Sequence, residues 1–316
     1  MRVLVTGGGG FIGSHLVQAL LEDGHEVRVL DNFATGRREN LLGLDASFDL
    51  VEGDIQSYER VHNAALGCEM VLHQAAMPSV PRSIQDPLTS NASNVIGTLN
   101  VLLAARDNDV RRVIFASSSS VYGASEGLPK HESQTPLPIS PYAVAKLAGE
   151  GYCRSFHSVY GLETVSLRYF NVFGPRQDPL SQYAAVIPNF LTAVLRGEDP
   201  TIFGDGTQTR DFTYISNVVD ANRLAMTAAD VAGQSLNVAC GGCISLNEVV
   251  STIAELTGRE VEPQYDPPRV GDVPHSMASI ERARAVLGFE PLIGFRDGLA
   301  RTIEYFERTS HSAQIA

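Results

Sequence analysis

Hydrophobic and polar positions alternate in two ways along the first 170 residues. Short apolar runs predict strands at 3–5, 27–30, 50–51, 70–73, 113–117 and 164–169. Between them, apolar positions recur every three or four residues and predict helices, one ending near Gly24 and others at 58–66, 91–106 and 142–159. Strands that alternate with helices of this length form parallel βαβ units. The pattern therefore predicts a doubly wound parallel sheet of the Rossmann type.

After Phe173-Gly174-Pro175 the alternation gives way to shorter pieces separated by Pro and Gly. Helices are expected at 187–196, 218–229, 246–257, 280–287 and 295–307, and strands at 201–203, 212–214 and 236–239. We predict a first domain of residues 1–170 and a smaller lobe of residues 171–316, with one or two elements returning to the first domain. Residues 309–316 lack periodicity and are expected to fray.

Composition narrows the class of protein. The chain has 316 residues, 24 Lys and Arg against 36 Asp and Glu, and a formal charge of −12. Nucleic acid is excluded as a partner, because binding to it depends on Lys and Arg that neutralise phosphates. No apolar run approaches the roughly 18 residues of a membrane span, and no signal-peptide pattern is present. Four cysteines are too few for a disulfide scaffold, so we expect a soluble cytoplasmic protein.

A glycine-rich turn links the first strand to the first helix. Gly7, Gly10 and Gly13 let main-chain amides and the helix N-terminus face a pyrophosphate. By itself the triplet also fits an ordinary tight turn. Asp31, at the end of the second strand, has the spacing of a carboxylate that binds an adenosine ribose diol, and it favours NAD over NADP. Asp54, after the third strand, reaches the adenine or serves as a turn residue, and the two interpretations carry equal weight.

A Tyr and a Lys share one face of the helix predicted at 142–159. Ser140 caps this helix, Pro141 opens it, and Tyr142 and Lys146 stand four residues apart. A tyrosine base needs its pKa lowered by roughly three units, to which Lys146, the helix N-terminus and a nicotinamide cation can contribute. Alone, this spacing is typical of a solvated helix face. Behind a dinucleotide loop it predicts a catalytic base.

Four serines end the fifth strand, at 117–120. Open α/β sheets bind ligands at the carboxyl ends of their strands, so these hydroxyls are expected beside the nicotinamide. A simple polar loop is the other interpretation.

Seven motifs extend over nearly the whole chain, at 6–13, 73–76, 117–123, 142–146, 168–174, 209–212 and 269–273. Together they resemble the extended short-chain dehydrogenase/reductases and, within them, the UDP-sugar 4-epimerases. Two further segments, 80–84 and 183–188, look most like bacterial UDP-N-acetylglucosamine 4-epimerases.

The resemblance implies roles for individual residues. Tyr142 would be the general base, Lys146 would lower its pKa and hold the nicotinamide ribose, and Ser118 would bind the sugar 4-hydroxyl. The cofactor NAD would contact Gly7, Gly10, Phe11, Ile12, Gly13, Asp31, Asn32, Asp54, Ile55, Gln74, Ala75, Tyr142, Lys146 and Tyr169. The UDP-sugar would contact Ser79, Ser118, Ser119, Ser120, Tyr142, Asn171, Ala185, Val186, Phe190, Arg210, Arg269, Asp272 and Ser276. Arg210 and Arg269 would meet phosphate and Asp272 a ribose hydroxyl, and no metal is expected.

The implied reaction oxidises and re-reduces one carbon. Tyr142 takes the 4-hydroxyl proton while carbon 4 gives a hydride to NAD, the 4-keto sugar turns, and the hydride returns to its other face. NAD would stay bound through each turnover. The resemblance also implies a homodimer, formed through the helices over 95–103 and 145–159.

Several alternatives remain. Related dehydratases and decarboxylases carry an acidic residue where this chain has Ser119 and Ser120, which favours an epimerase. Ser276, in place of a bulky tyrosine, leaves volume for N-acetyl sugars. The runner-up is a UDP-glucuronate 4-epimerase. Members of that group often have Thr at the position of Asn171 and Arg at that of Asp178, although Ser79 and Arg82 could help to bind a uronate.

An NAD-sensing regulator without activity is a hypothesis from another class, but such a protein would not need the Tyr, Lys and Ser together. Cys240 and Cys243 form a C-x-x-C pair without a second pair or nearby histidines, and this is a weak signal for zinc or redox chemistry. His73, at a strand end, is interpreted as structural.

Overall fold

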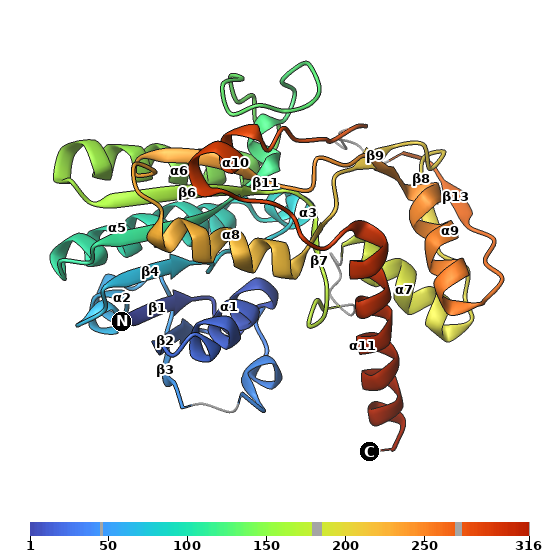
Figure 1. Cartoon of the computed structure of the whole chain (residues 1–316), viewed down its shortest axis with the longest axis horizontal. Coiled ribbons are helices and arrows are strands. Elements are labelled where there is room, and N and C mark those ends of the chain that lie inside the picture. The colour runs from blue at the N-terminus through green and yellow to red at the C-terminus, as the bar shows by residue number, and fades with distance from the viewer. Residues whose placement is uncertain (45–46, 179–184, 269–273, 316) are drawn as a thin grey trace.

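The computed structural model describes residues 1–44, 47–178, 185–268 and 274–315, with side chains as far as Thr309. Figure 1 shows a central sheet with helices on both faces, and beside it a second group of elements that contains α7, α9 and α11. The N-terminus lies at the sheet and the C-terminus at the far end of α11.

The central sheet has seven parallel strands in the order β11-β6-β5-β4-β1-β2-β3. Their bounds are Arg2–Thr6 (β1), Glu26–Asp31 (β2), Asp49–Glu52 (β3), Met70–His73 (β4), Arg112–Ser118 (β5), Glu163–Tyr169 (β6) and Gln234–Val238 (β11). The strand order reverses between β1 and β4, where Thr6 pairs with His73. Ligands of such sheets bind at this switch point. The predicted Rossmann-type sheet is confirmed.

Each face of the sheet is covered by helices whose apolar side chains form the core. On one face, α2 (Tyr58–Ala65), α5 (Gly97–Asp107) and α6 (Pro141–Tyr160) pack against one another. On the other face, α1 (Phe11–Glu22) packs against α8 (Ile215–Thr227). Strands β1, β2, β4, β5 and β6 are almost wholly buried, as expected for a parallel sheet covered on both sides.

The region before α5 differs from the single helix predicted over 91–106. The structure has α3 (Val80–Gln85), α4 (Pro87–Asn91) and one π-helical turn over 92–96. Ser79 and Asp86 each accept a hydrogen bond from an amide of the helix that follows, so both act as helix caps. The two capped helices thus precede the range predicted as helical, and the π-helical turn over 92–96 interrupts that range before α5 begins.

The second lobe is built from helices and short strand pairs. Its helices are α7 (Val186–Arg196), α9 (Leu246–Thr257) and α11 (Phe295–Ile315), whereas α10 (Glu281–Leu287) packs against β11 and α8 beside the central sheet (Figure 1). The strand pairs are β7 (Val172–Phe173) with β10 (Thr213–Tyr214), β8 (Thr201–Phe203) with β13 (Gln264–Asp266), and β9 (Thr209–Arg210) with β12 (Ile244–Ser245). Strand β11 pairs with β6 in the central sheet, and α8 packs against α1 and β5 on one face of that sheet. The prediction that residues 309–316 fray is wrong as far as Ile315, because α11 continues to that residue.

Within the described ranges, no helix is long and apolar enough to cross a membrane. Short 3₁₀ turns at Arg38–Leu41 and Ser119–Tyr122 follow β2 and β5 and lie near the ends of the central strands.

Candidate active site

The glycine-rich turn between β1 and α1 brings main-chain atoms into close approach. Gly7 has a φ of +71°, and the Gly10 amide donates to the Gly7 carbonyl at 3.0 Å. A Cβ on Gly13 would stand 2.0 Å from that carbonyl oxygen, so only glycine fits there. The helix α1 begins directly after Gly10. Its first turn offers N–H groups and partial positive charge to an anion.

Asp31 ends β2 beside this turn and is 8% exposed. Its Oδ2 accepts from the Gly9 amide at 2.8 Å, and its Oδ1 accepts from the Phe33 amide at 2.7 Å. The two bonds fix the carboxylate against the glycine turn. Each oxygen keeps a further lone pair for a diol.

The contacts of Asp54 agree both with a turn residue and with a residue that reaches the adenine. Its Oδ1 accepts from the Gln56 amide at 2.8 Å, as a turn residue does. Its Oδ2 accepts from Asn32 Nδ2 at 2.8 Å, and both of these side chains line a cavity.

That cavity, of about 900 Å³, lies at the carboxyl ends of the central strands. Its size falls within the range of about 300–1,000 Å³ that is common for small-molecule sites. It is lined by all the residues predicted to contact the cofactor: Gly7, Gly10, Phe11, Ile12, Gly13, Asp31, Asn32, Asp54, Ile55, Gln74, Ala75, Tyr142, Lys146 and Tyr169. The exposed amides of α1, the glycine cradle and the carboxylate of Asp31 together fit NAD. Ser79, Arg82 and Ala185 also line the cavity.

Tyr142 stands at the start of α6, whose N-terminus is fixed by neighbouring serines. Ser140 Oγ accepts from the Ala143 amide at 3.2 Å, and Ser83 Oγ accepts from the Tyr142 amide at 3.1 Å. Burial raises the pKa of the half-buried phenol, while a hydrogen bond with Ser118 lowers it. Ser118 is thus near enough to the phenol to affect its pKa, and the bond predicted between Ser118 and the sugar 4-hydroxyl stays a prediction.

Lys146 lies one turn further along α6 and is 3% exposed. Its Nζ donates to the Ala116 carbonyl at 2.8 Å and stands 5.8 Å from the centre of the Tyr142 ring. Burial lowers the pKa of Lys146 to about 8, so the ammonium remains the major form at neutral pH. The expected lowering of the Tyr142 pKa is not achieved by the protein's own groups, because burial of the phenol outweighs the hydrogen bond that opposes it.

The serine loop after β5 carries no carboxylate. Ser118 Oγ accepts from the Ser120 amide at 3.2 Å and lies 2.9 Å from Ser120 Oγ. Ser117 lines the cavity of the glycine turn, and its Oγ donates to Glu150 Oε1 at 2.5 Å. Glu150 also pairs with Arg168 Nη2 at 2.7 Å. This buried pair links α6 to β6 beside the strand that carries Ser118.

His73 has a structural environment, as interpreted from the sequence. The Thr98 hydroxyl donates to the Asn94 carbonyl at 2.7 Å, so it accepts from His73 Nε2 at 3.0 Å. The other ring nitrogen, Nδ1, then accepts from Thr6 Oγ1 at 2.7 Å. Burial and the nearby Lys146 lower the pKa of His73 to about 3, so the ring is neutral.

A segment of the second lobe crosses the cofactor-binding loops, and we call residues 175–178 the strap. His15 Nε2 donates to the Pro175 carbonyl at 3.0 Å, and Arg176 donates to the Ser14 carbonyl at 3.1 Å. Arg37, after β2, pairs with Asp178 at 2.6 Å. Arg37, Arg176 and Asp178 line the same cavity as the glycine turn. The strap and Arg37 were not predicted as part of the site.

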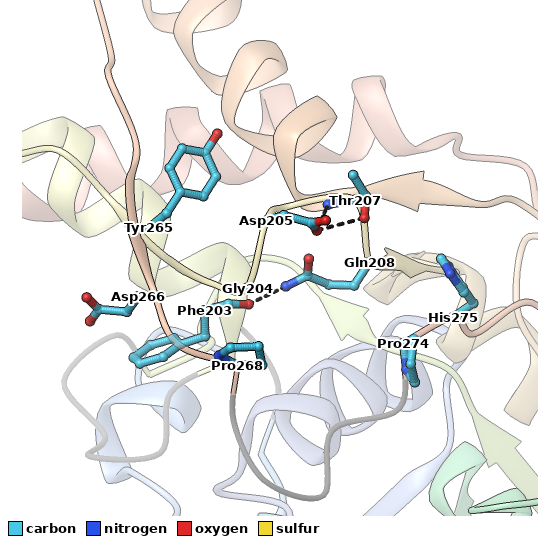
Figure 2. Close-up of a pocket in the computed structure, with 10 residues that line it drawn as sticks. All are labelled: Phe203, Gly204, Asp205, Thr207, Gln208, Tyr265, Asp266, Pro268, Pro274 and His275. Atoms are coloured by element: carbon cyan, nitrogen blue, oxygen red, sulfur yellow. Dashed lines mark hydrogen bonds between the residues drawn. The ribbon is translucent and has the colours of Figure 1, made fainter.

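A second cavity, of about 710 Å³, lies in the smaller lobe. It is lined by Phe203, Gly204, Asp205, Thr207, Gln208, Tyr265, Asp266, Pro268, Pro274 and His275. Figure 2 shows Gln208 reaching to the Phe203 carbonyl, with Tyr265 and Asp266 on one side and Pro274 and His275 on the other. Aromatic and proline surfaces beside main-chain polar groups suit a planar ligand with a polar edge. None of these residues was predicted from the sequence.

The remaining predicted substrate residues are distributed around these cavities. Arg210 adjoins the second cavity, where its Nη1 donates to the Pro274 carbonyl at 3.1 Å. Ser276 lies two residues further on, and its amide donates to the Thr209 carbonyl at 3.1 Å. Arg269 and Asp272 lie outside the described residues.

Asn171 adopts a φ of +33° and donates to the Asp211 carbonyl at 3.1 Å. Val186 begins α7 and is half-buried. Phe190 is 3% exposed and packs in the core, so the structure places it on neither cavity.

The described part of the chain offers no cluster of metal ligands. No group of three or more His, Cys, Asp or Glu side chains there could hold a metal ion. Cys240 is half-buried, with an Asn217 amide 3.6 Å from its sulfur, and Cys243 is exposed.

Comparison with known proteins agrees with this geometry. A UDP-glucose 4-epimerase of Mycolicibacterium smegmatis is 42% identical over 98% of this chain and 100% of its own length. The structure of a UDP-N-acetylglucosamine 4-epimerase from Methanobrevibacter ruminantium, in complex with UDP-N-acetylmuramic acid, is 40% identical. It covers 98% of both chains with a TM-score of 0.93. The Thermus thermophilus UDP-glucose 4-epimerase in complex with NAD is 38% identical, covers 97% of this chain and 99% of that one, and has a TM-score of 0.89.

The family model that matches is the NAD dependent epimerase/dehydratase family, and it matches over residues 3–239. This range contains the glycine turn, the serine loop and the Tyr142–Lys146 pair. The chain therefore belongs to the NAD dependent epimerase/dehydratase family.

Proposed function

We propose that the chain is an NAD-dependent 4-epimerase of UDP-hexoses. One observation carries the proposal: Tyr142 and Lys146 both line the cavity of the glycine turn, and the serine loop that follows β5 beside them, residues 118–120, has no carboxylate. Without an acidic group in this loop, elimination of water has no evident acid. Incubation of purified protein with UDP-glucose or UDP-N-acetylglucosamine should yield the 4-epimer. Substantial 4,6-dehydration instead would refute the assignment.

The protein groups divide the chemistry among them. Bound NAD supplies a hydride acceptor at the nicotinamide. Tyr142 accepts the proton of the sugar 4-hydroxyl, and Ser118 orients that hydroxyl. Lys146 binds the nicotinamide ribose, and its ammonium favours the phenolate form of Tyr142. The carboxylate of Asp31 excludes a 2′-phosphate, which supports NAD rather than NADP.

The UDP half of the substrate is assigned to the smaller lobe. The second cavity takes the uridine, between the surfaces of Phe203 and Pro274. Arg210 contacts the diphosphate, with Asn171 and Val186 near it. The contacts of Arg269 with the phosphate and of Asp272 with a ribose hydroxyl stay predictions. We accordingly assign NAD binding to residues 1–170 and UDP-sugar binding to residues 171–316, apart from the return of β11 and α8.

N-acetylated sugars belong to the proposed substrates, because Ser276 stands where related enzymes carry a bulky tyrosine and so leaves volume for the N-acetyl group. We would measure kcat/KM of the wild type and of Ser276→Tyr for two pairs of substrates, UDP-GlcNAc with UDP-GalNAc and UDP-glucose with UDP-galactose. The substitution should lower kcat/KM selectively for the N-acetylated pair. Equal losses would argue against this role of Ser276.

UDP-glucuronate remains the alternative substrate. Arg82 lines the catalytic cavity and could meet a carboxylate, whereas Asp178 is engaged by Arg37. Parallel assays with UDP-glucuronate and UDP-N-acetylglucosamine separate the two. Protein that binds NAD but epimerises neither would instead support a regulatory role.

We also propose a cytoplasmic homodimer. Leu88 on α4, Ile96 on the π-helical turn and Val144 on α6 are 83%, 45% and 54% exposed, and these three elements pack together. A second copy seated on these helices would bury them. Light scattering should give the mass of two chains, and a monomer would contradict the dimer. All four cysteines are free thiols, which suits a reducing compartment.

A further inference from the structure

We propose that Asp211 is a positioning residue for the UDP half of the substrate. The inference rests on the proposed function. Asp211 does not itself line either cavity in the described residues. It follows Arg210 directly and lies at the point where three segments of the smaller lobe meet.

The carboxylate of Asp211 holds two of these segments by their main chains. Its Oδ1 accepts from the Cys240 amide at 3.0 Å. Its Oδ2 accepts from the Gly241 amide and from the Ala278 amide, each at 3.1 Å. The residue is 0% exposed, so these bonds compensate a charge that water does not reach. A carboxylate can accept all three bonds, whereas a neutral amide cannot.

The segments that meet at Asp211 carry the groups assigned to UDP. Arg210 immediately precedes it, and Asn171 Nδ2 donates to its carbonyl at 3.1 Å. The third segment, residues 274–278, runs beside β9, where the Thr209 amide donates a hydrogen bond to the Pro274 carbonyl at 3.0 Å. This segment includes two residues that line the uridine cavity. Asp211 therefore sets the position of Arg210 relative to the opposite wall of the UDP site.

A purely structural role and a positioning role predict different results. If Asp211 only stabilised the fold, the folded fraction of a variant would bind UDP normally. If Asp211 positions the groups assigned to UDP, the folded variant should bind UDP weakly. Hydride transfer in the saturated enzyme should then stay nearly normal. The split between KM and kcat therefore tests the inference.

The first experiment uses Asp211→Asn, which keeps the size of the side chain but turns an N–H donor toward main-chain N–H groups. We expect the Kd for UDP, measured by calorimetry well below the unfolding temperature, to rise at least tenfold. The KM for the UDP-sugar should rise by a similar factor, with kcat within about threefold and bound NAD unchanged. Asp220→Asn, on the exposed side of α8, is the matched control and should leave all four quantities unchanged.

A folded Asp211→Asn protein that binds UDP as tightly as the wild type would overturn the inference. Failure of the wild type to bind UDP would refute the proposed function instead, so the two failures are distinguishable.

Should the variant not fold, the unsubstituted carboxyl can be titrated. Burial raises the pKa of Asp211 to about 6, against the opposing effect of its amide donors. The neighbouring Cys240 thiol, whose pKa burial raises to about 11, stays neutral in this range. Lys130, joined to the same segment by its main chain, directs its ammonium to the Ser125 carbonyl.

We would measure this titration in a His275→Gln background, which removes the imidazole of the segment. Binding of UDP-glucose should weaken as the pH falls through about 6, because protonation replaces an acceptor by a donor. The diphosphate of UDP-glucose, esterified at both ends, does not change its charge there. A Kd that stays constant from pH 8 to 5 would contradict the inference.

Discussion

The cofactor half and the UDP half of the site are built in different ways. The cofactor cavity lies on the ends of β1, β2, β4 and β5, strands of one sheet in fixed parallel register. The second cavity, to which we assign the uridine, lies between two-stranded pairs and loops, with β8 and β13 contributed by distant parts of the chain. The difference suits the proposed reaction. Hydride transfer requires fixed distances, whereas the sugar must turn while its diphosphate stays anchored.

The largest expected effect is confined to the chemical step. Tyr142→Phe removes the phenol oxygen that accepts the proton, and general acid–base catalysis contributes about 10²- to 10⁴-fold. We expect kcat to fall about 10³-fold. Bound NAD and the Kd for UDP should stay within twofold, since neither half of the site loses its anchoring groups. Simultaneous loss of UDP affinity would show that the two halves are not independent.

The next effect belongs to the UDP half. Arg210→Ala removes charge-assisted hydrogen bonds worth about 1.5–3 kcal/mol, which corresponds to a rise in KM of about 10- to 100-fold. The value of kcat at saturation should change little. A large fall in kcat with constant KM, measured by initial rates over a range of substrate concentration, would place Arg210 at the chemical step instead.

Ser118→Ala should reduce kcat by roughly tenfold and also move its pH dependence. The Ser118 hydrogen bond lowers the pKa of Tyr142, so its loss raises that pKa. Because the base must be deprotonated to accept the proton, the rising limb of kcat against pH should shift to higher pH. An unchanged profile would mean that Ser118 does not act on Tyr142.

The smallest effect concerns the strap. Asp178→Asn breaks the ion pair with Arg37, both members of which are partly exposed. Such pairs contribute about 0.2–1 kcal/mol, so NAD release, followed by ultrafiltration, should accelerate up to about fivefold. Glu52→Gln, which breaks the neighbouring Arg38–Glu52 pair outside the cavity, is the control. Equal acceleration in both variants would show that the strap does not retain the cofactor.

The same contrast explains what the sequence could predict. The cofactor residues follow directly from strand ends, because every parallel strand delivers its last residues to one edge of the sheet. Gly7 after β1, Asp31 at the end of β2 and Gln74 after β4 therefore line one cavity. Local pattern predicted Gly7 and Asp31, whereas Gln74 was predicted from the family resemblance.

The UDP cavity could not be found in this way. Phe203 and Tyr265 line one cavity because β8 pairs with β13. Each of these strands has three residues, too few for a periodic pattern that would reveal the pairing. Asp211 offered no signal beyond its place in a motif, because its partners are main-chain amides. Likewise, the helices before α5 depended on the caps at Ser79 and Asp86, which the apolar pattern does not register.

The most direct test of the account follows the hydrogen on carbon 4. UDP-glucose and UDP-N-acetylglucosamine, each deuterated at carbon 4, would be equilibrated with the purified protein and examined by NMR. The account predicts that a 4-epimer forms and keeps deuterium at carbon 4, because the hydride that leaves is the one that returns. Absence of an epimer with both sugars, or an epimer whose carbon 4 has lost its deuterium, would contradict it.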